Sequence, residues 1–110
     1  MGLEDQKCTP CEGGVEPFSE QEIEEYRGEL DEEWEVVSNH HLRREFDFDD
    51  FESALNFVNH IGAIAEEEGH HPDIYLTWGE AAVEIYTHKI DGLHENDFIL
   101  AKKFEEEYQS

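Results

Sequence analysis

The chain has 110 residues, of which 37% are hydrophobic, enough for one modest core and too few for two. Asp and Glu number 30 against 7 Lys and Arg, a formal net charge of −23 that repels phosphate backbones and anionic lipids and so disfavours a nucleic-acid or membrane-surface role. No apolar run approaches the ~20 residues of a membrane helix. Residues 1–7 are polar and acidic, unlike a secretory signal, so we expect a cytoplasmic protein.

The acidic excess admits two interpretations. One is an ordinary acidic protein, and the other is adaptation to a salty cytoplasm, where many carboxylates keep the surface hydrated and salt screens their mutual repulsion. A charge density this high also occurs in disordered chains. Apolar patterning, rather than composition, must therefore show whether the chain folds.

Residues 1–17 show no periodic apolar pattern and contain three glycines and two prolines, which predicts an irregular N-terminal arm. The arm carries a single C-x-x-C, Cys8 and Cys11. A zinc site needs about four ligands and a second C-x-x-C is missing, so we expect two ordinary thiols. Zinc shared between subunits, or completed by His40 and His41, is the alternative.

The single domain predicted over residues 18–110 opens with a helix. Ser19 and Glu22 have the spacing of a capping box, in which each side chain accepts a hydrogen bond from the other residue's backbone N–H. Apolar side chains then follow at helical spacing: Ile23, Tyr26 and Leu30. Two short strands are predicted next, over residues 34–37 and 42–48. In the second strand Arg44 interrupts the apolar alternation.

The strongest periodicity in the chain predicts a long helix with Asp49 as its cap and Gly69 as its end. The apolar face expected from the i, i+3, i+4, i+7 rule consists of Phe51, Ala54, Leu55, Val58, Ile61 or Gly62, and Ala65. This pattern is the best indication in the sequence that the chain folds.

Two further strands are predicted over residues 73–78 and 82–88. The two-residue loop Gly79-Glu80 between them favours an antiparallel hairpin with a type II′ turn. A last helix is predicted over residues 95–108. The order α-β-β-α-β-β-α, with hairpin-linked strands, predicts an α+β domain whose helices cover one face of an antiparallel sheet.

The densest group of polar side chains follows the long helix. Glu66 and His70 share a helical face, His71 follows at once, and Pro72 directs the chain out of the helix. The strand pairing would return His88 to the same corner. Imidazoles exchange protons near neutral pH, so two of them with a carboxylate could donate one proton and accept another during an elimination of water.

Two other interpretations of these histidines are open. They could be unrelated surface or core-capping side chains, or they could bind zinc with Glu66. Adjacent residues in an extended segment point to opposite faces, which makes joint ligation of one ion by His70 and His71 awkward. We therefore favour proton transfer over metal binding.

The same residues carry a family resemblance, which runs from about Ser19 to Tyr108. The chain resembles pterin-4a-carbinolamine dehydratase, and the specific part is the spacing between His-His-Pro and Thr-His. The matching residues are Glu66-x-x-x-His70-His71-Pro72, Tyr75, Trp78, Thr87-His88, Gly92-Leu93, Asn96-Asp97 and Leu100-Ala101, with Trp34, Phe46, Phe48, Phe51 and Ala54 before them. The sequence departs from the family at Gly69, His94 and Asn96, which affects contacts around the site but removes no histidine.

The resemblance implies a four-stranded antiparallel sheet with three helices on one face. It also implies the dehydration of 4a-hydroxytetrahydropterin to quinonoid dihydropterin, which recycles the pterin used by aromatic amino acid hydroxylases, with no metal or organic cofactor. It implies a homodimer or homotetramer and functional coupling to such a hydroxylase. By position, His70 and His88 would transfer protons with Glu66 assisting or holding a histidine. The implied substrate-binding residues are His71, Pro72 and Asp97, although Asp97 is equally placed to cap the last helix.

Two rival functions share these features. One is a non-catalytic dimerisation or regulatory module, which would not need the histidine set. The other is a dehydratase acting on a molybdopterin-related pterin, which the sequence does not separate from the first function.

Overall fold

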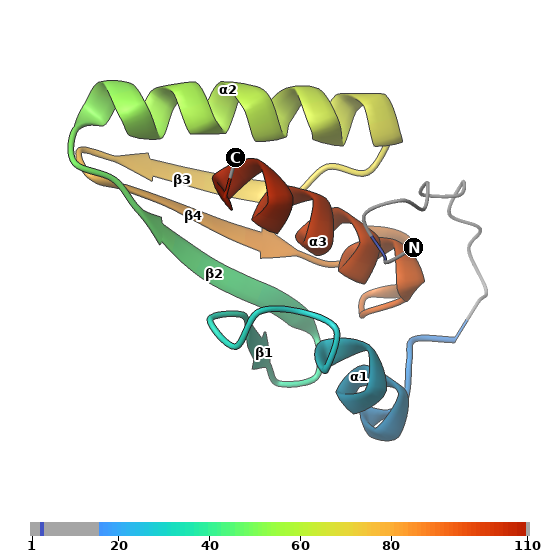
Figure 1. The fold of residues 1–110 in the computed structure, drawn as a ribbon. Coiled ribbons are helices and arrows are strands. Elements are labelled where there is room, and N and C mark those ends of the chain that lie inside the picture. Colours follow the sequence, from blue (N-terminus) through green and yellow to red (C-terminus); the bar gives the residue numbers. More distant parts are fainter. Residues whose placement is uncertain (1–2, 4–15, 110) are drawn as a thin grey trace.

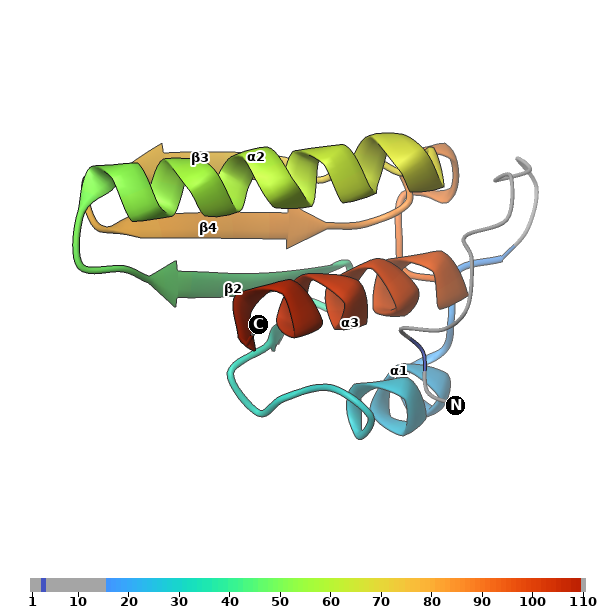
Figure 2. The ribbon, with the colours of Figure 1, turned by 45° about the horizontal axis from the view of Figure 1, so that its top comes forward.

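The computed structural model describes Leu3 and residues 16–109 (Figure 1). The elements are α1 (Glu20–Arg27), β1 (Glu35–Val37), β2 (His41–Asp47), α2 (Phe51–Glu68), β3 (Asp73–Thr77), β4 (Glu80–Ile85), the 3₁₀ turn η2 (His88–Ile90) and α3 (Glu95–Gln109). The four strands form one antiparallel sheet in the order β1-β2-β4-β3. The helices lie on one face of that sheet, with α2 along β3 and β4 and α1 beside α3 (Figure 2). The predicted α+β fold is confirmed.

The predicted arm and the C-x-x-C lie largely outside the described residues. Leu3 is buried in the hydrophobic core, and the Phe18 N–H donates to the Leu93 carbonyl at 2.8 Å. Within the described part of the chain, no helix is long and apolar enough to cross a membrane.

Each of the first two helices, α1 and α2, is capped at its N-terminus by a nearby side chain. The predicted capping box is present, with Glu22 N–H donating to Ser19 Oγ at 3.3 Å and Ser19 N–H donating to Glu22 Oε1 at 2.9 Å. The predicted cap of α2 is wrong by one residue, because Asp50, not Asp49, accepts from Ser53 N–H at 2.8 Å. That hydrogen bond holds the pKa of Asp50 below its ordinary value.

The core-facing side of α2 differs from the predicted one. The buried residues are Ala54, Phe57, Ile61 and Ala65, whereas Phe51 and Leu55 are 43% and 37% exposed. Phe57, absent from the predicted face, packs against Phe46 with ring centres 4.7 Å apart. Apolar residues occupy more than one stripe of this helix, so the sheet it packs on decides which stripe is buried.

Arg44 explains the interrupted alternation in β2. Its side chain is buried on the core face, with the guanidinium carbon 4.5 Å from the ring centre of Phe46 and 5.4 Å from that of Tyr108. An arginine stacks its planar cation on aromatic faces, so it occupies an otherwise apolar row. Leu42, Arg44 and Phe46 therefore all face the core in alternation along β2, although Arg44 is not an apolar residue.

The hairpin between β3 and β4 is antiparallel as predicted, but its loop is shifted. Thr77 pairs with Glu80, so the loop is Trp78-Gly79. Gly69 is the one glycine with positive φ in the described residues, and the predicted II′ turn with Gly79 at its first position is therefore wrong. β4 ends at Ile85, three residues earlier than expected.

Candidate active site

A left-handed turn at the end of α2 positions His70. Gly69 has φ 68° and ψ 26°, and the His70 N–H donates to the Ala65 carbonyl at 3.1 Å. This conformation favours glycine because it has no Cβ. The turn directs the His70 side chain inward, where the residue is 9% exposed.

Asp97 is the inner partner of His70. Its side chain is fully buried, and His70 Nε2 lies 2.6 Å from Asp97 Oδ1. The other carboxylate oxygen accepts from Thr87 Oγ1 and from the His94 N–H, each at 2.8 Å. A carboxylate only accepts, so the proton in the His70 contact belongs to Nε2 and a neutral His70 keeps Nδ1 as its proton acceptor.

The contact from His94 identifies a second role for Asp97. Asp97 is the third residue of α3, and its carboxylate accepts from the backbone N–H that precedes the helix. This is the geometry of a capping carboxylate. The buried Asp97 side chain therefore caps the N-terminus of α3 and also orients His70, just after the end of α2.

Glu66 pairs with His71 rather than with His70. His71 Nε2 lies 2.8 Å from Glu66 Oε1, and both side chains are exposed, by 64% and 81%. The helical spacing placed Glu66 on the same face as His70, but the turn at Gly69 moves His70 inward and leaves His71 above the carboxylate. As predicted, the two adjacent histidines point apart.

His88 does not end a strand, as the sequence suggested, but begins the three-residue turn η2. The loop around it is closed at its base, where Thr87 N–H donates to the Gly92 carbonyl at 2.9 Å. The side chain of Thr87 reaches Asp97, so this loop and the His70 turn share one buried anchor.

His70, His71 and His88 line one pocket, which has a cavity volume of about 210 Å³. Its lining consists of Gly69, His70, His71, Thr87, His88 and Lys89. Asp97, Glu66 and Pro72 are not among the residues that line the pocket, although Asp97 bonds His70 and Glu66 bonds His71. Thr87 and Lys89 were not among the predicted site residues, although their places next to His88 in the sequence could have suggested them.

The polar groups at the pocket are suited to proton transfer. Nε2 of His70 and Nε2 of His71 each face a carboxylate at hydrogen-bond distance. Among the residues that the structure describes, no three His, Cys, Asp or Glu side chains are grouped so that they could hold a metal ion. His70 and His71 thus present imidazoles oriented by carboxylates, an arrangement that can support acid and base chemistry.

Fold and site together define an α+β protein with a histidine-lined pocket, and comparison with known proteins assigns its family. Residues 16–107 match the family described as pterin 4 alpha carbinolamine dehydratase. A protein of Alkaliphilus metalliredigens with that family name is 50% identical over 105 residues, covering 96% of this chain and 95% of the relative. One from Rubrobacter xylanophilus is 52% identical over 101 residues, covering 92% and 94%.

The fold comparison agrees. The crystal structure of a transcriptional coactivator/pterin dehydratase from Brucella melitensis matches with a TM-score of 0.78 and 28% identity, over 84% of this chain and 98% of the other. The chain belongs to the pterin-4-alpha-carbinolamine dehydratase family. It is accordingly a dehydratase, an enzyme of the hydro-lyase class.

Proposed function

We propose that this protein dehydrates 4a-hydroxytetrahydropterin to quinonoid dihydropterin, in the recycling of tetrahydropterin. The observation that carries the proposal is the pocket lined by His70, His71 and His88, with His70 bonded to a buried aspartate. The family membership supports the same reaction. Its physiological setting would be next to an aromatic amino acid hydroxylase, whose spent pterin is the substrate.

The reaction needs two proton transfers. The 4a-hydroxyl must receive a proton so that it leaves as water when the carbon–oxygen bond breaks, and a ring N–H must lose its proton as the new double bond forms. We assign these transfers to His70 and His88, one as general acid and one as general base. Either assignment leaves the enzyme with the same number of protons after one turnover, so the reaction needs no co-reactant.

The remaining residues are assigned supporting roles. Asp97 acts through His70, because its carboxylate selects the Nε2–H form and stabilises the imidazolium when His70 carries a second proton. Glu66 holds His71 in the same way at the pocket rim, and His71 orients the substrate. Pro72 sets the path of the chain behind His71. Because Asp97 is fully buried, we replace its expected contact with substrate by this positioning role.

A non-catalytic regulatory function is less well supported. The Brucella melitensis protein is described as both a transcriptional coactivator and a pterin dehydratase, but a scaffold has no need of three histidines around one pocket. Self-association into a homodimer or homotetramer remains a prediction. It is compatible with the exposed apolar side chains Phe51, Leu55, Tyr75 and Trp78.

The test is direct. An aromatic amino acid hydroxylase generates 4a-hydroxytetrahydropterin in a stopped-flow instrument, and its decay is followed by absorbance with and without this protein. We expect decay to accelerate in proportion to protein concentration. Folded protein that leaves the decay rate unchanged, while a known dehydratase accelerates it, would contradict the proposed reaction.

A further inference from the structure

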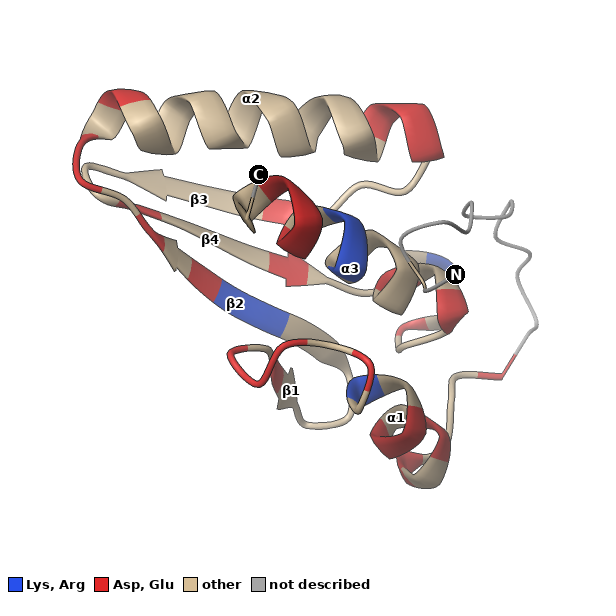
Figure 3. Cartoon of the chain, in the orientation of Figure 1, with Lys and Arg blue, Asp and Glu red and all other residues tan. Residues whose placement is uncertain are grey.

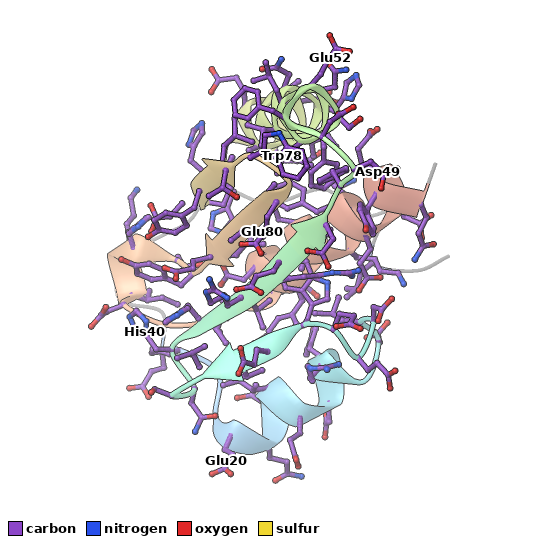
Figure 4. All side chains as sticks on the ribbon, turned by 90° about the vertical axis from the view of Figure 1, so that its left-hand side faces the viewer. Glu20, His40, Asp49, Glu52, Trp78 and Glu80 are labelled. Atoms are coloured by element: carbon purple, nitrogen blue, oxygen red, sulfur yellow. The ribbon has the colours of Figure 1, made fainter. Side chains whose placement is uncertain are left out.

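A second group of aromatic and titratable side chains lies behind the loop that carries His88. It consists of His40, His41, Tyr86 and Asp91, which we call the hairpin cluster. None of these residues lines the pocket of the three histidines. The contact between His40 and Asp91 joins the β1–β2 hairpin to η2, two segments far apart in the sequence. Figure 4 labels His40 on the hairpin.

The contacts of the cluster lead to His88. The ring of Tyr86 lies between two imidazoles, with its centre 4.2 Å from that of His88 and 4.5 Å from that of His40. The Tyr86 and His88 rings meet edge to face, an arrangement that aromatic pairs favour. His88 is exposed on a three-residue turn, and the Tyr86 ring packs directly against its imidazole.

A polar contact ties the end of the same turn to the hairpin. Nε2 of His40 lies 2.7 Å from Oδ1 of Asp91, the residue that ends η2 with a φ of 51°. The Asp91 N–H donates to the His88 carbonyl at 3.2 Å. His40 therefore contacts both Asp91, at the end of η2, and the ring of Tyr86.

The backbone of the turn between β1 and β2 fixes the position of His40. Ser38 and Asn39 both have a φ of 54°, and the His40 N–H donates to the Val37 carbonyl at 2.9 Å. Nδ1 of His40 also lies 3.1 Å from Nδ1 of His41, so one imidazole donates and the other accepts. This contact fixes the ring of His40 from its other side.

We propose that Tyr86 and His40 are positioning residues that hold the imidazole of His88 in the orientation needed for proton transfer. The inference rests on the proposed function, because it gives His88 a catalytic task. Catalysis is sensitive to such placement, since a displacement of about 1 Å can cost on the order of 100-fold in rate. Tyr86 and His40 would thus affect turnover without touching the substrate.

The kinetic test compares Tyr86→Leu with the conservative Tyr86→Phe. We expect Tyr86→Leu to lower kcat by about 10-fold with little change in KM, and Tyr86→Phe to restore kcat because it keeps the ring. His40→Ala should lower kcat in the same direction, whereas the control His60→Ala, an exposed histidine on α2, should not. In a His88→Ala background, Tyr86→Leu should cause no further fall. An equal fall in both backgrounds would overturn the inference.

An NMR measurement separates this inference from the proposed function. In the native protein the His88 ring protons lie against the Tyr86 ring and should be shifted by its ring current. The shift should disappear in Tyr86→Leu and persist in Tyr86→Phe. Native protein without dehydratase activity would contradict the proposed function, yet the shift would still report whether Tyr86 holds His88. Identical His88 resonances in all three proteins would overturn the positioning role.

Discussion

His70 and Asp97, 27 residues apart in the chain, are joined by a hydrogen bond of 2.6 Å in the protein interior. This pair connects the end of α2 to the start of α3. It ties the cap of α3 to the orientation of His70, because the same carboxylate caps a helix and selects the proton position on an imidazole.

Asp97→Asn should impair both properties. The amide keeps the shape of the side chain and can still accept from Thr87 and His94, but its NH2 group then faces Nε2 of His70, which accepts only in the other tautomer, and the charge-assisted hydrogen bonds are lost. We expect the free energy of unfolding in urea to fall by about 1–3 kcal/mol. We also expect kcat to fall more than KM changes, because His70 loses its defined tautomer. Asp49→Asn, at an exposed position, is the matched control and should change neither quantity.

Removal of either proposed proton-transfer histidine should reduce turnover strongly. A general acid or base typically contributes about 10²–10⁴-fold, so His70→Ala and His88→Ala should each lower kcat by that order. His88→Ala should leave the melting temperature nearly unchanged, because His88 is exposed on a short turn. His60→Ala serves as the control histidine. Native rates in both pocket variants would show that the chemistry lies elsewhere.

Salt should stabilise the protein. Acidic residues occur on every helix and on the sheet, whereas Lys and Arg are few (Figure 3), and the net charge is −23. Self-repulsion destabilises the folded state at low ionic strength, and it is screened over about 3 Å at 1 M salt. We expect the melting temperature to rise from dilute to molar NaCl. A flat or falling curve would argue against adaptation to a salty cytoplasm and for ordinary acidity.

Metal removal should leave activity intact. Proton transfer uses the imidazole nitrogens that a bound zinc ion would occupy. Exhaustive chelation should therefore not lower kcat, and added zinc should inhibit or have no effect. The result against this expectation is stoichiometric metal in the purified protein, with activity lost on chelation and restored by zinc.

The cap of α2 should give a measurable pH dependence. The hydrogen bond from Ser53 N–H lowers the pKa of Asp50, so the folded state favours the ionised carboxylate. A lowered pKa contributes stability above the unfolded value, near 3.8, and loses it as the pH falls through the folded value. The native protein should therefore melt at a higher temperature than Asp50→Ala at pH 7, and the difference should narrow in acid.

Asp49→Ala is the control for the cap, because it removes the same charge and the same side-chain atoms from the neighbouring residue. It should alter the melting temperature little across the pH range. Equal effects of the two substitutions at pH 7 would mean that net charge, rather than the cap, accounts for the stability of the native protein.

Much of the fold follows from local signals in the sequence. The capping box of Ser19 and Glu22, the stop at Gly69 and the order of the elements depend on hydrogen bonds and periodicities within a few residues. The convergence of His70 and His88 on one pocket was also predicted, because an antiparallel hairpin returns the chain to its starting edge. The caps and the order of the elements need no knowledge of how the elements pack, whereas the return of His88 relies on the pairing of β3 with β4, although His88 begins η2 rather than ending a strand.

Packing between elements decided the rest. The burial of Phe57 in place of Phe51 depends on which stripe of α2 meets the sheet. The pairing of Glu66 with His71, and of His70 with Asp97, depends on how the turn at Gly69 sits against α3. Such contacts join residues whose separation in the chain says nothing about their distance in space. The sequence by itself therefore determined the order of the elements and supplied the candidate site residues, whereas the tertiary structure decided the partners of those residues, because hydrogen bonds between elements form only where packing brings donor and acceptor within about 3 Å.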